Sequence, residues 1–137
     1  MAATTFIDTN ILIYSVDRAD PVKREIAISI IAEHAANRTG VISTQVLQEF
    51  YSAATRKLGI HPSAAKKHLQ DFQIFDVVQV SPTTIEQGIE LSTLHQLSFW
   101  DGLIIAAAAT ANATELLSED LNHNQTIEGI SIRNPFI

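Results

Sequence analysis

Residues 97–109 read "LSFWDGLIIAAAA" and place a single carboxylate, Asp101, between an aromatic pair and an unbroken run of small and aliphatic residues. Such a run is typical of a buried helix, so an acid at its start needs an explanation. One explanation is structural, because Ser98 and Asp101 have the spacing of a helical capping box. The other is functional, and it depends on whether further isolated acids occupy equivalent places in the chain.

The sequence on either side of this stretch alternates between strand-like and helix-like segments. Short apolar runs predict strands, and apolar residues at helical spacing behind a cap or a proline predict helices. The expected strands are residues 4–8, 39–43, 75–80, 114–118 and 129–134. The expected helices are residues 21–37, 44–58, 62–72, 82–95 and 99–113. Residues 75–80 are rich in valine and are expected to be buried.

This alternation predicts an α/β fold with a mainly parallel sheet covered by helices on both faces. A chain of 137 residues fits one domain, and no linker or repeat divides residues 1–137. In sheets of this kind, ligands bind beyond the carboxyl ends of the strands. Functional residues are therefore expected where strands end.

The composition is that of an ordinary soluble globular protein, with 46% hydrophobic and 7% aromatic residues. No window approaches the ~20 apolar residues of a membrane span, and the N-terminus lacks the pattern of a secretory signal. The sequence has no cysteine, which excludes disulfides and thiolate metal sites. The expected location is the cytoplasm, with which the absence of cysteine is compatible.

The net charge of −6 is unevenly distributed along the chain. Residues 1–67 carry eight Lys or Arg against six acids, whereas residues 68–137 carry one, Arg133, against nine. Affinity for nucleic-acid phosphates normally comes from clustered Lys and Arg. If the chain handles nucleic acid, divalent cations and the N-terminal half must supply the positive charge.

Four acids are expected at the same end of the sheet, although they are far apart in sequence. Asp8 ends the first strand, Glu49 follows the second by one to two helical turns, and Asp120 follows the fourth by two residues. Asp101 lies in the first turn of the apolar helix. Each acid alone has a structural interpretation as a helix cap, a solvated side chain or a turn residue. A single metal site would explain all of them together.

The electrostatics of such a cluster favour a bound cation. Two carboxylates ~4 Å apart at an effective dielectric constant of 20 repel each other by about 4 kcal/mol. Four of them cannot all stay ionised in one cleft unless cations neutralise them or some are protonated. Oxygen ligands alone favour Mg²⁺ or Mn²⁺, and such ions can activate water and stabilise the charge that develops on a phosphodiester.

Four motifs carry a family resemblance: "FIDTNILIY" (6–14), "QVLQEFY" (45–51), "SFWDGLIIAAA" (98–108) and "LLSEDLNHNQTIEGISIRNPF" (116–136). With these motifs in this order, the chain resembles PIN-domain ribonucleases, specifically the VapC-like toxins of bacterial type II (VapBC) toxin–antitoxin systems. The resemblance covers essentially the whole chain. It implies a three-layer α/β/α sandwich in a single PIN-like domain.

The resemblance also implies an activity and partners. It implies a Mg²⁺-dependent endoribonuclease, with Mn²⁺ as an alternative ion, that cleaves tRNA or another structured RNA. It further implies a homodimer and a cognate antitoxin protein that blocks the cleft. The residues that match the family's catalytic, metal-binding acids are Asp8, Glu49, Asp101 and Asp120, and those that match its polar supporting positions are Asn10 and Ser118.

The sequence departs from the family pattern after the fourth acid. Many relatives carry another acid where Asn122 stands, which puts ligation there in doubt. Asn124 occupies a position where this subgroup is expected to have glycine, but asparagine tolerates left-handed backbone, so the turn is expected to persist. Glu119 is adjacent to Asp120 and competes with it as the fourth ligand; the distance from Ser118 favours Asp120.

The densest basic group flanks the turn after the helix that bears Glu49. It consists of Arg56, Lys57, Lys66 and Lys67. These side chains either contact the RNA backbone beside the acidic cleft or form a solvated basic surface. Trp100 could stack on a base, but its place before an apolar helix predicts that it packs in the protein interior.

Other functions fit the sequence less well. A phosphotransfer enzyme of the haloacid dehalogenase type needs a second carboxylate where Asn10 stands, and a response-regulator receiver needs a lysine near the last strands, whereas none follows Lys67. Two alternatives stay open: a catalytically silent PIN-fold interaction module, and a regulatory domain that handles phosphate in an acidic pocket.

Overall fold

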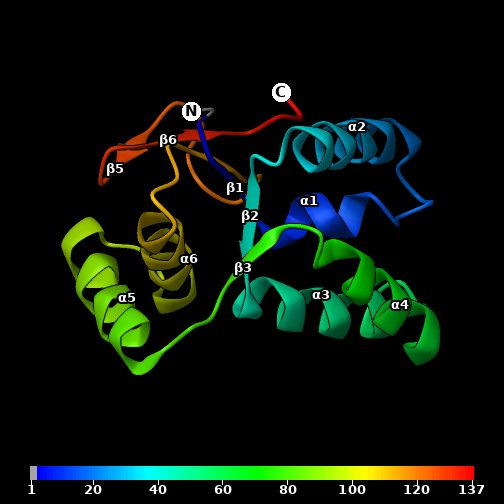
Figure 1. The fold of residues 1–137 in the computed structure, drawn as a ribbon, viewed down its shortest axis with the longest axis horizontal. Helices are drawn as coiled ribbons and strands as arrows, with labels where there is room; N and C mark the ends of the chain where they lie inside the picture. The colour runs from blue at the N-terminus through cyan, green and yellow to red at the C-terminus, as the bar shows by residue number, and fades with distance from the viewer. Residues whose placement is uncertain (1–2) are drawn as a thin grey trace.

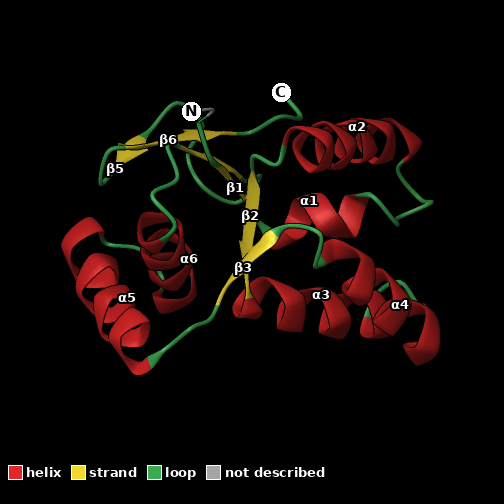
Figure 2. Ribbon diagram, viewed as in Figure 1, coloured by secondary structure: helices red, strands yellow, loops and turns green. Residues whose placement is uncertain are grey.

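The computed structural model describes residues 3–137 and shows a six-stranded sheet between two groups of helices (Figures 1 and 2). The strands are β1 (Thr5–Ile7), β2 (Gly40–Ser43), β3 (Asp76–Val78), β4 (Glu115–Leu117), β5 (Thr126–Ile127) and β6 (Ile130–Arg133). The helices are α1 (Thr9–Tyr14), α2 (Pro21–Asn37), α3 (Thr44–Arg56), α4 (Pro62–Phe72), α5 (Pro82–His95) and α6 (Phe99–Thr110). The predicted α/β/α architecture is confirmed: α1 to α4 lie on one side of the sheet, and α5 and α6 lie on the other (Figure 1).

The strand order places β1 and β4 side by side in the middle of the sheet. The order is β3-β2-β1-β4-β6-β5, and every neighbouring pair is parallel except β5 and β6. Ile7 pairs with Leu117 at the carboxyl ends of β1 and β4. Because the two strands run in parallel, the next residues, Asp8 and Ser118, emerge together at the same edge of the sheet.

The apolar stretch that follows Asp101 forms the buried part of α6. Residues 102–108 are all buried, because α6 packs on α5 on one side and approaches β2 on the other. A helix that is apolar all round must be enclosed in this way. Ser98 is its N-cap and accepts a hydrogen bond from the backbone N–H of Asp101. The helix therefore begins just before the acid, which leaves the carboxylate at the end of the buried layer.

Close packing between α5 and α6 depends on Gly102. A Cβ atom at this position would lie 2.5 Å from the carbonyl oxygen of Gly88 and 2.8 Å from Cβ of Ser92, both on α5. Replacement of Gly102 by alanine must therefore push the helices apart, and it is expected to lower the free energy of unfolding by about 1–3 kcal/mol. Urea denaturation measures this loss, with Ala109→Ser at an exposed position of α6 as the control. Equal stability of Gly102→Ala and the wild type would contradict the packing described.

The structure differs from the sequence-based expectation in several elements. The apolar helix ends at Thr110 instead of residue 113, because Asn112 adopts a left-handed conformation with φ of 56°. Strand β3 was expected to be buried, but it lies at the edge of the sheet and is only partly covered. The short strand β5 was not predicted. Within residues 3–137, no helix is long and apolar enough to cross a membrane.

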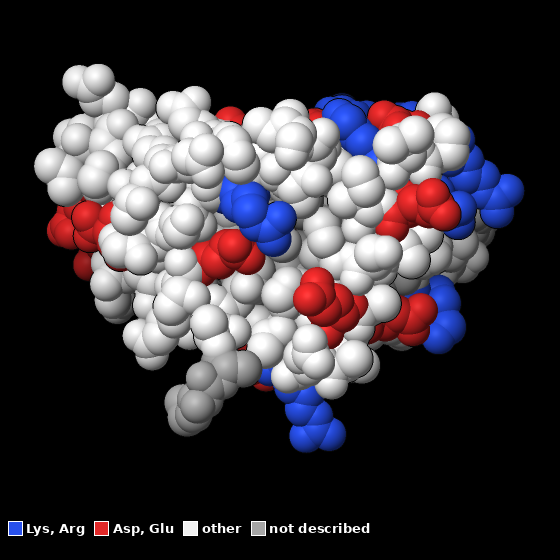
Figure 3. Space-filling model, turned by 90° about the horizontal axis from the view of Figure 1, so that it is seen from above, with Lys and Arg blue, Asp and Glu red and all other residues white. Residues whose placement is uncertain are grey.

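The basic residues, which lie mostly in the N-terminal half of the sequence, also lie mostly at one end of the folded molecule. The N-terminal half builds α1 to α3 and most of α4, which lie at the right of Figure 1. Most of the Lys and Arg side chains on the face shown in Figure 3 lie toward the same end of the molecule. Acidic side chains appear at both ends of this face, and Lys23 and Lys67 pair with Glu119 and Asp71 of the C-terminal half.

Candidate active site

Asp8 is buried where β1 and β4 end. Its side chain is only 6% exposed. Oδ1 accepts a hydrogen bond from the backbone N–H of Thr9 (2.7 Å), and Oδ2 accepts one from the hydroxyl of Ser118 (2.7 Å). Asp8 is also the N-cap of α1, as its structural interpretation predicts. The cap uses one carboxylate oxygen, and the other faces the neighbouring strand end.

Burial raises the pKa of Asp8 to about 7, although the hydrogen bonds from Ser118 and Thr9 act to lower it. The charges of Asp120 and Glu49 raise this pKa further, which places both acids in the electrostatic surroundings of Asp8. An ionised carboxylate at this depth is costly unless a positive charge accompanies it. A proton or a cation bound at this carboxylate would remove that cost.

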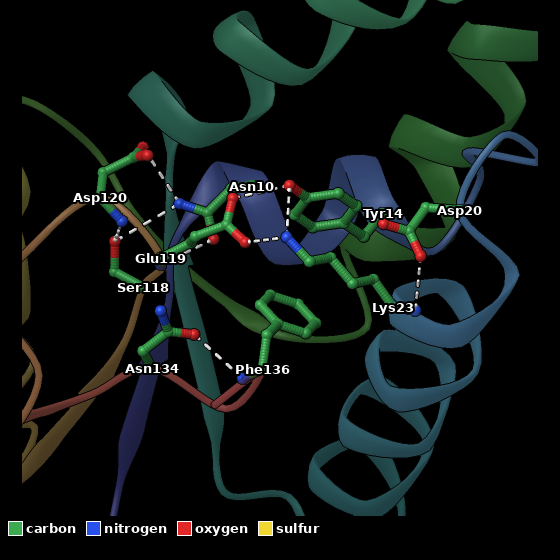
Figure 4. A network of polar contacts seen from close by, with 9 residues as sticks. All are labelled: Asn10, Tyr14, Asp20, Lys23, Ser118, Glu119, Asp120, Asn134 and Phe136. Carbon is green, nitrogen blue, oxygen red and sulfur yellow. Dashed lines mark hydrogen bonds and ion pairs between the residues drawn. The ribbon is translucent and has the colours of Figure 1, made fainter.

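Asn10 and Ser118 hold the loop that carries Asp120 (Figure 4). Nδ2 of Asn10 donates hydrogen bonds to Oδ2 of Asp120 (3.1 Å) and to Oγ of Ser118 (3.4 Å). Oδ1 of Asn10 accepts from the backbone N–H of Glu119 (3.2 Å), and Oγ of Ser118 accepts from the N–H of Asp120 (3.1 Å). These contacts fix the position of Asp120 relative to α1 and to the end of β4.

Glu119, which precedes Asp120, bonds to side chains of α1 and α2. Its carboxylate pairs with Nζ of Lys23 (2.5 Å) and accepts a hydrogen bond from the hydroxyl of Tyr14 (2.6 Å), and Lys23 lies over the rings of Tyr14 and Phe136 (Figure 4). Burial acts to raise the pKa of Glu119, but the hydrogen bonds from Lys23 and Tyr14 outweigh it and hold the pKa below its usual value. Lys23 thus draws Glu119 toward α2, and the adjacent Asp120 faces Asn10.

Glu49 connects three helices. Its Oε1 accepts a hydrogen bond from the hydroxyl of Thr9 (2.7 Å) on α1, and its Oε2 accepts from Nε2 of Gln45 (3.5 Å) on α3. Gln45 also donates to the backbone carbonyl of Trp100 (3.2 Å) on α6. Sequence reasoning missed Thr9 and Gln45 as positioning residues. The available signals were that Thr9 follows Asp8 directly and that Gln45 precedes Glu49 by one helical turn.

Asp101 shows only one of the two hydrogen bonds of the capping box that its spacing from Ser98 suggests. Ser98 accepts from its backbone N–H at 3.1 Å, but among the described residues no reciprocal bond links the Asp101 side chain to the backbone of Ser98. Burial raises the pKa of Asp101, the Ser98 hydroxyl acts to lower it, and the charge of Asp120 raises it. The charge of Asp120 therefore raises the pKa values of both Asp8 and Asp101, and the charge of Glu49 raises that of Asp8.

Two of the four predicted acids line one cavity, and Asp8 and Asp101 are not part of its lining. Glu49 and Asp120 line a cavity of about 770 Å³ between α1 and α3, together with Thr9 and Asn10. Within residues 3–137, no three acids or histidines are placed as one set of metal ligands. The donors are all oxygen atoms, which fits a hard divalent cation.

The predicted basic group is divided in the structure. Arg56 and Lys57 line the same cavity as Glu49. Lys66 and Lys67 lie on the exposed surface of α4, and Lys67 pairs with Asp71 at 3.1 Å. Only the first two are thus next to the acids.

The prediction that Trp100 packs in the interior is wrong. Its side chain is 61% exposed and meets the ring of Phe99 edge to face, with centroids 5.0 Å apart. The reason is its place in α6: Trp100 belongs to the first turn, before the enclosed part of the helix begins at Gly102. An exposed aromatic ring therefore lies next to Asp101.

The turn after the fourth acid is formed as expected. Asn124 adopts a left-handed conformation with φ of 68°, and its backbone N–H donates to the carbonyl of Ile132 (2.9 Å). Asparagine thus takes the backbone conformation that glycine adopts most easily. Asn122 is exposed in the same loop.

Comparison with known proteins identifies the class to which this fold and site belong. The model of the PIN domain family matches residues 5–128, and the chain belongs to this family. No protein of curated function matches the sequence significantly.

Solved structures with the same fold include toxin–antitoxin proteins. A toxin–antitoxin complex from Klebsiella pneumoniae aligns with a TM-score of 0.72 at 21% identity, covering 96% of this chain and 98% of that one. VapBC2 from Rickettsia felis, bound to a DNA fragment from its promoter, gives 0.68 at 21% identity with the same coverage. VapC20 of Mycobacterium tuberculosis, a toxin that cleaves the sarcin–ricin loop, gives 0.66 at 19% identity, covering 82% and 87%. At these identities the likeness establishes a shared fold.

Proposed function

We propose that the chain is a Mg²⁺-dependent endoribonuclease and the toxin of a type II toxin–antitoxin pair. The observation that carries this proposal is the position of Asp8, a carboxylate buried where β1 and β4 end, whose pKa is raised by burial and further by the charges of Asp120 and Glu49. Membership of the PIN family and the shared fold with VapC-type toxins support it. A structural cap alone would not need the additional acids around it.

The residues that would hold the ion are Asp8, Glu49, Asp101 and Asp120. A divalent cation bound there supplies a water of lowered pKa and offsets the charge that develops on the scissile phosphodiester. The chain contributes positioning: Ser118 orients Asp8, Asn10 orients Asp120, and Thr9 orients Glu49. The cavity lined by Glu49 and Asp120 would admit the RNA strand on this side of the site.

Cleavage assays with and without free divalent ions test the activity. Purified protein incubated with tRNA and other structured RNAs should produce defined fragments in Mg²⁺. Excess chelator should abolish cleavage, and added Mg²⁺ or Mn²⁺ should restore it. Cleavage that persists in chelator would contradict a metal-dependent mechanism. Failure to cut any RNA under all ion conditions would favour the silent interaction module.

The same proposal implies two protein partners, an antitoxin and a second copy of the chain. Several structures with this fold are complexes with an antitoxin, which supports a cognate antitoxin for this chain. Expression of the chain alone should arrest bacterial growth, expression of Asp8→Asn should not, and co-expression of the antitoxin should relieve the arrest.

The proposed homodimer is tested by sedimentation, where a strictly monomeric species at micromolar concentration would refute it.

RNA binding should depend on salt through the basic residues near the cavity. In an Asp8→Asn background with Mg²⁺ present, replacing Arg56 and Lys57 by glutamine should weaken binding of any RNA and lower the salt slope by about 0.7 units per lost phosphate contact. The matched pair Lys66→Gln and Lys67→Gln should have a smaller effect, because these side chains line no part of this cavity. An unchanged affinity and slope in both pairs would show that the basic group only forms a solvated surface.

A further inference from the structure

A second cavity continues the groove beyond the acids. It has a volume of about 620 Å³ and lies at the C-terminal end of α1, bordered by the α1–α2 connection, by α2 and by the turn between α3 and α4. The two cavities share the lining residues Asp17, Lys57 and Leu58. The two cavities therefore adjoin each other.

The second cavity is rich in positive charge. Three basic side chains, Arg18, Arg24 and Lys57, line it together with His68, against a single acid, Asp17. Among the described residues, none of these four side chains forms an ion pair. The Nε atom of Arg24 is buried and has no hydrogen-bond partner within residues 3–137. We name this site the basic cavity.

Building on the ribonuclease function proposed above, we infer that the basic cavity binds an uncut backbone phosphate of the RNA substrate. Guanidinium groups match phosphate oxygens in geometry and charge. Helix α1 has six residues and a length of about 9 Å. The acids lie at one end of this helix and the basic cavity at the other, so the bound phosphate belongs to a nucleotide neighbouring the scissile bond.

RNA fits this site better than an acidic protein segment does. The basic cavity continues the cavity in which the scissile phosphodiester would lie, as a polynucleotide requires. The C-terminal half of the chain, with nine acids and one arginine, repels a polyanion elsewhere. Beyond Arg56 and Lys57, which line the acidic cavity itself, a strand held at the acids meets its next positive charges at Arg18 and Arg24.

Arginine substitutions at the two ends of α2 test the inference. Arg24→Gln removes a side chain of the basic cavity, and Arg18→Gln removes an exposed one from its rim. Arg38→Gln is the matched control, because Arg38 caps the opposite end of α2 and lines neither cavity. Affinity for a fluorescent single-stranded RNA oligonucleotide is measured by anisotropy in the Asp8→Asn background, with Mg²⁺ present and over a range of salt. A polyglutamate peptide is measured in parallel.

The two cavity variants should each weaken RNA binding about 10-fold at low salt. They should also lower the salt slope by about 0.7 units each, whereas Arg38→Gln should change neither quantity. Unchanged RNA affinity in both cavity variants would overturn the inference, and an accompanying loss of polyglutamate binding would assign the cavity to a protein partner. Because the measurement does not depend on cleavage, an inactive wild type would contradict the proposed function without deciding the role of the basic cavity.

Discussion

Replacement of Asp8 by asparagine is expected to lower the rate of RNA cleavage by more than about 100-fold while the chain remains folded. The estimate is a lower bound, since loss of an outer partner of a metal ligand alone costs about 10- to 100-fold. Asparagine keeps the shape of the side chain and one oxygen acceptor, but it cannot supply the negative charge that would hold a cation among the acids. Asp101→Asn should lose activity in the same way.

The control for these variants is Glu33→Gln, which removes one carboxylate from the exposed surface of α2. Rates are compared on one labelled RNA at saturating Mg²⁺, and circular dichroism confirms the fold of each protein. Activity of Asp8→Asn within a few-fold of the control would exclude this carboxylate from the reaction. Loss of activity together with unfolding would instead favour a purely structural role as the cap of α1.

The stability of the metal-free protein is expected to fall as the pH rises from about 4 to 7, because of Asp8. Its pKa is raised from 3.8 to about 7 by burial. Between these values the folded chain keeps a proton that the unfolded chain has released, so folding is favoured at low pH and this advantage is lost as the pH approaches 7. A difference of about three pKa units corresponds to a change of about 4 kcal/mol over this range.

Asp8→Asn has no proton to lose at this position and should lack this part of the pH dependence. Urea denaturation in chelator at pH 5 and pH 8 measures the effect as the change in the stability difference between the two proteins. The difference should shift in favour of the variant at pH 8. Other titrating groups, such as Glu119, are present in both proteins and cancel to first order. Parallel pH profiles would contradict the buried, uncompensated carboxylate.

The fold was predictable because local patterns and tertiary structure agree over most of the chain. Cap residues and prolines mark the starts of α2, α4 and α5, and all three begin where the sequence indicates. The prediction and the structure disagree where the outcome depends on how whole elements are arranged in space. The apolar residues of β3 do not reveal that it is an edge strand, and a two-residue strand such as β5 is too short to leave a pattern.

The site was predictable only as a set of neighbouring acids. The sequence indicates that Asp8 and Ser118 lie at one edge of a parallel sheet, and the pairing of β1 with β4, which it does not indicate, brings them into contact. The contacts that orient each carboxylate depend on side chains from distant elements. Lys23 of α2 pairs with Glu119, 96 positions later in the chain, and no local feature of either segment indicates the other. No local feature of the sequence indicates that Trp100 is exposed, either.

Binding of Mn²⁺ to the RNA-free protein, followed by electron paramagnetic resonance of the free ion, tests the central claim most directly. Wild type and Glu33→Gln should bind Mn²⁺ and release it when Mg²⁺ is added in excess. Asp8→Asn and Asp101→Asn should bind Mn²⁺ at least about 10-fold more weakly. Equal binding by all four proteins, or no binding by the wild type, would show that the four acids do not form a divalent-cation site.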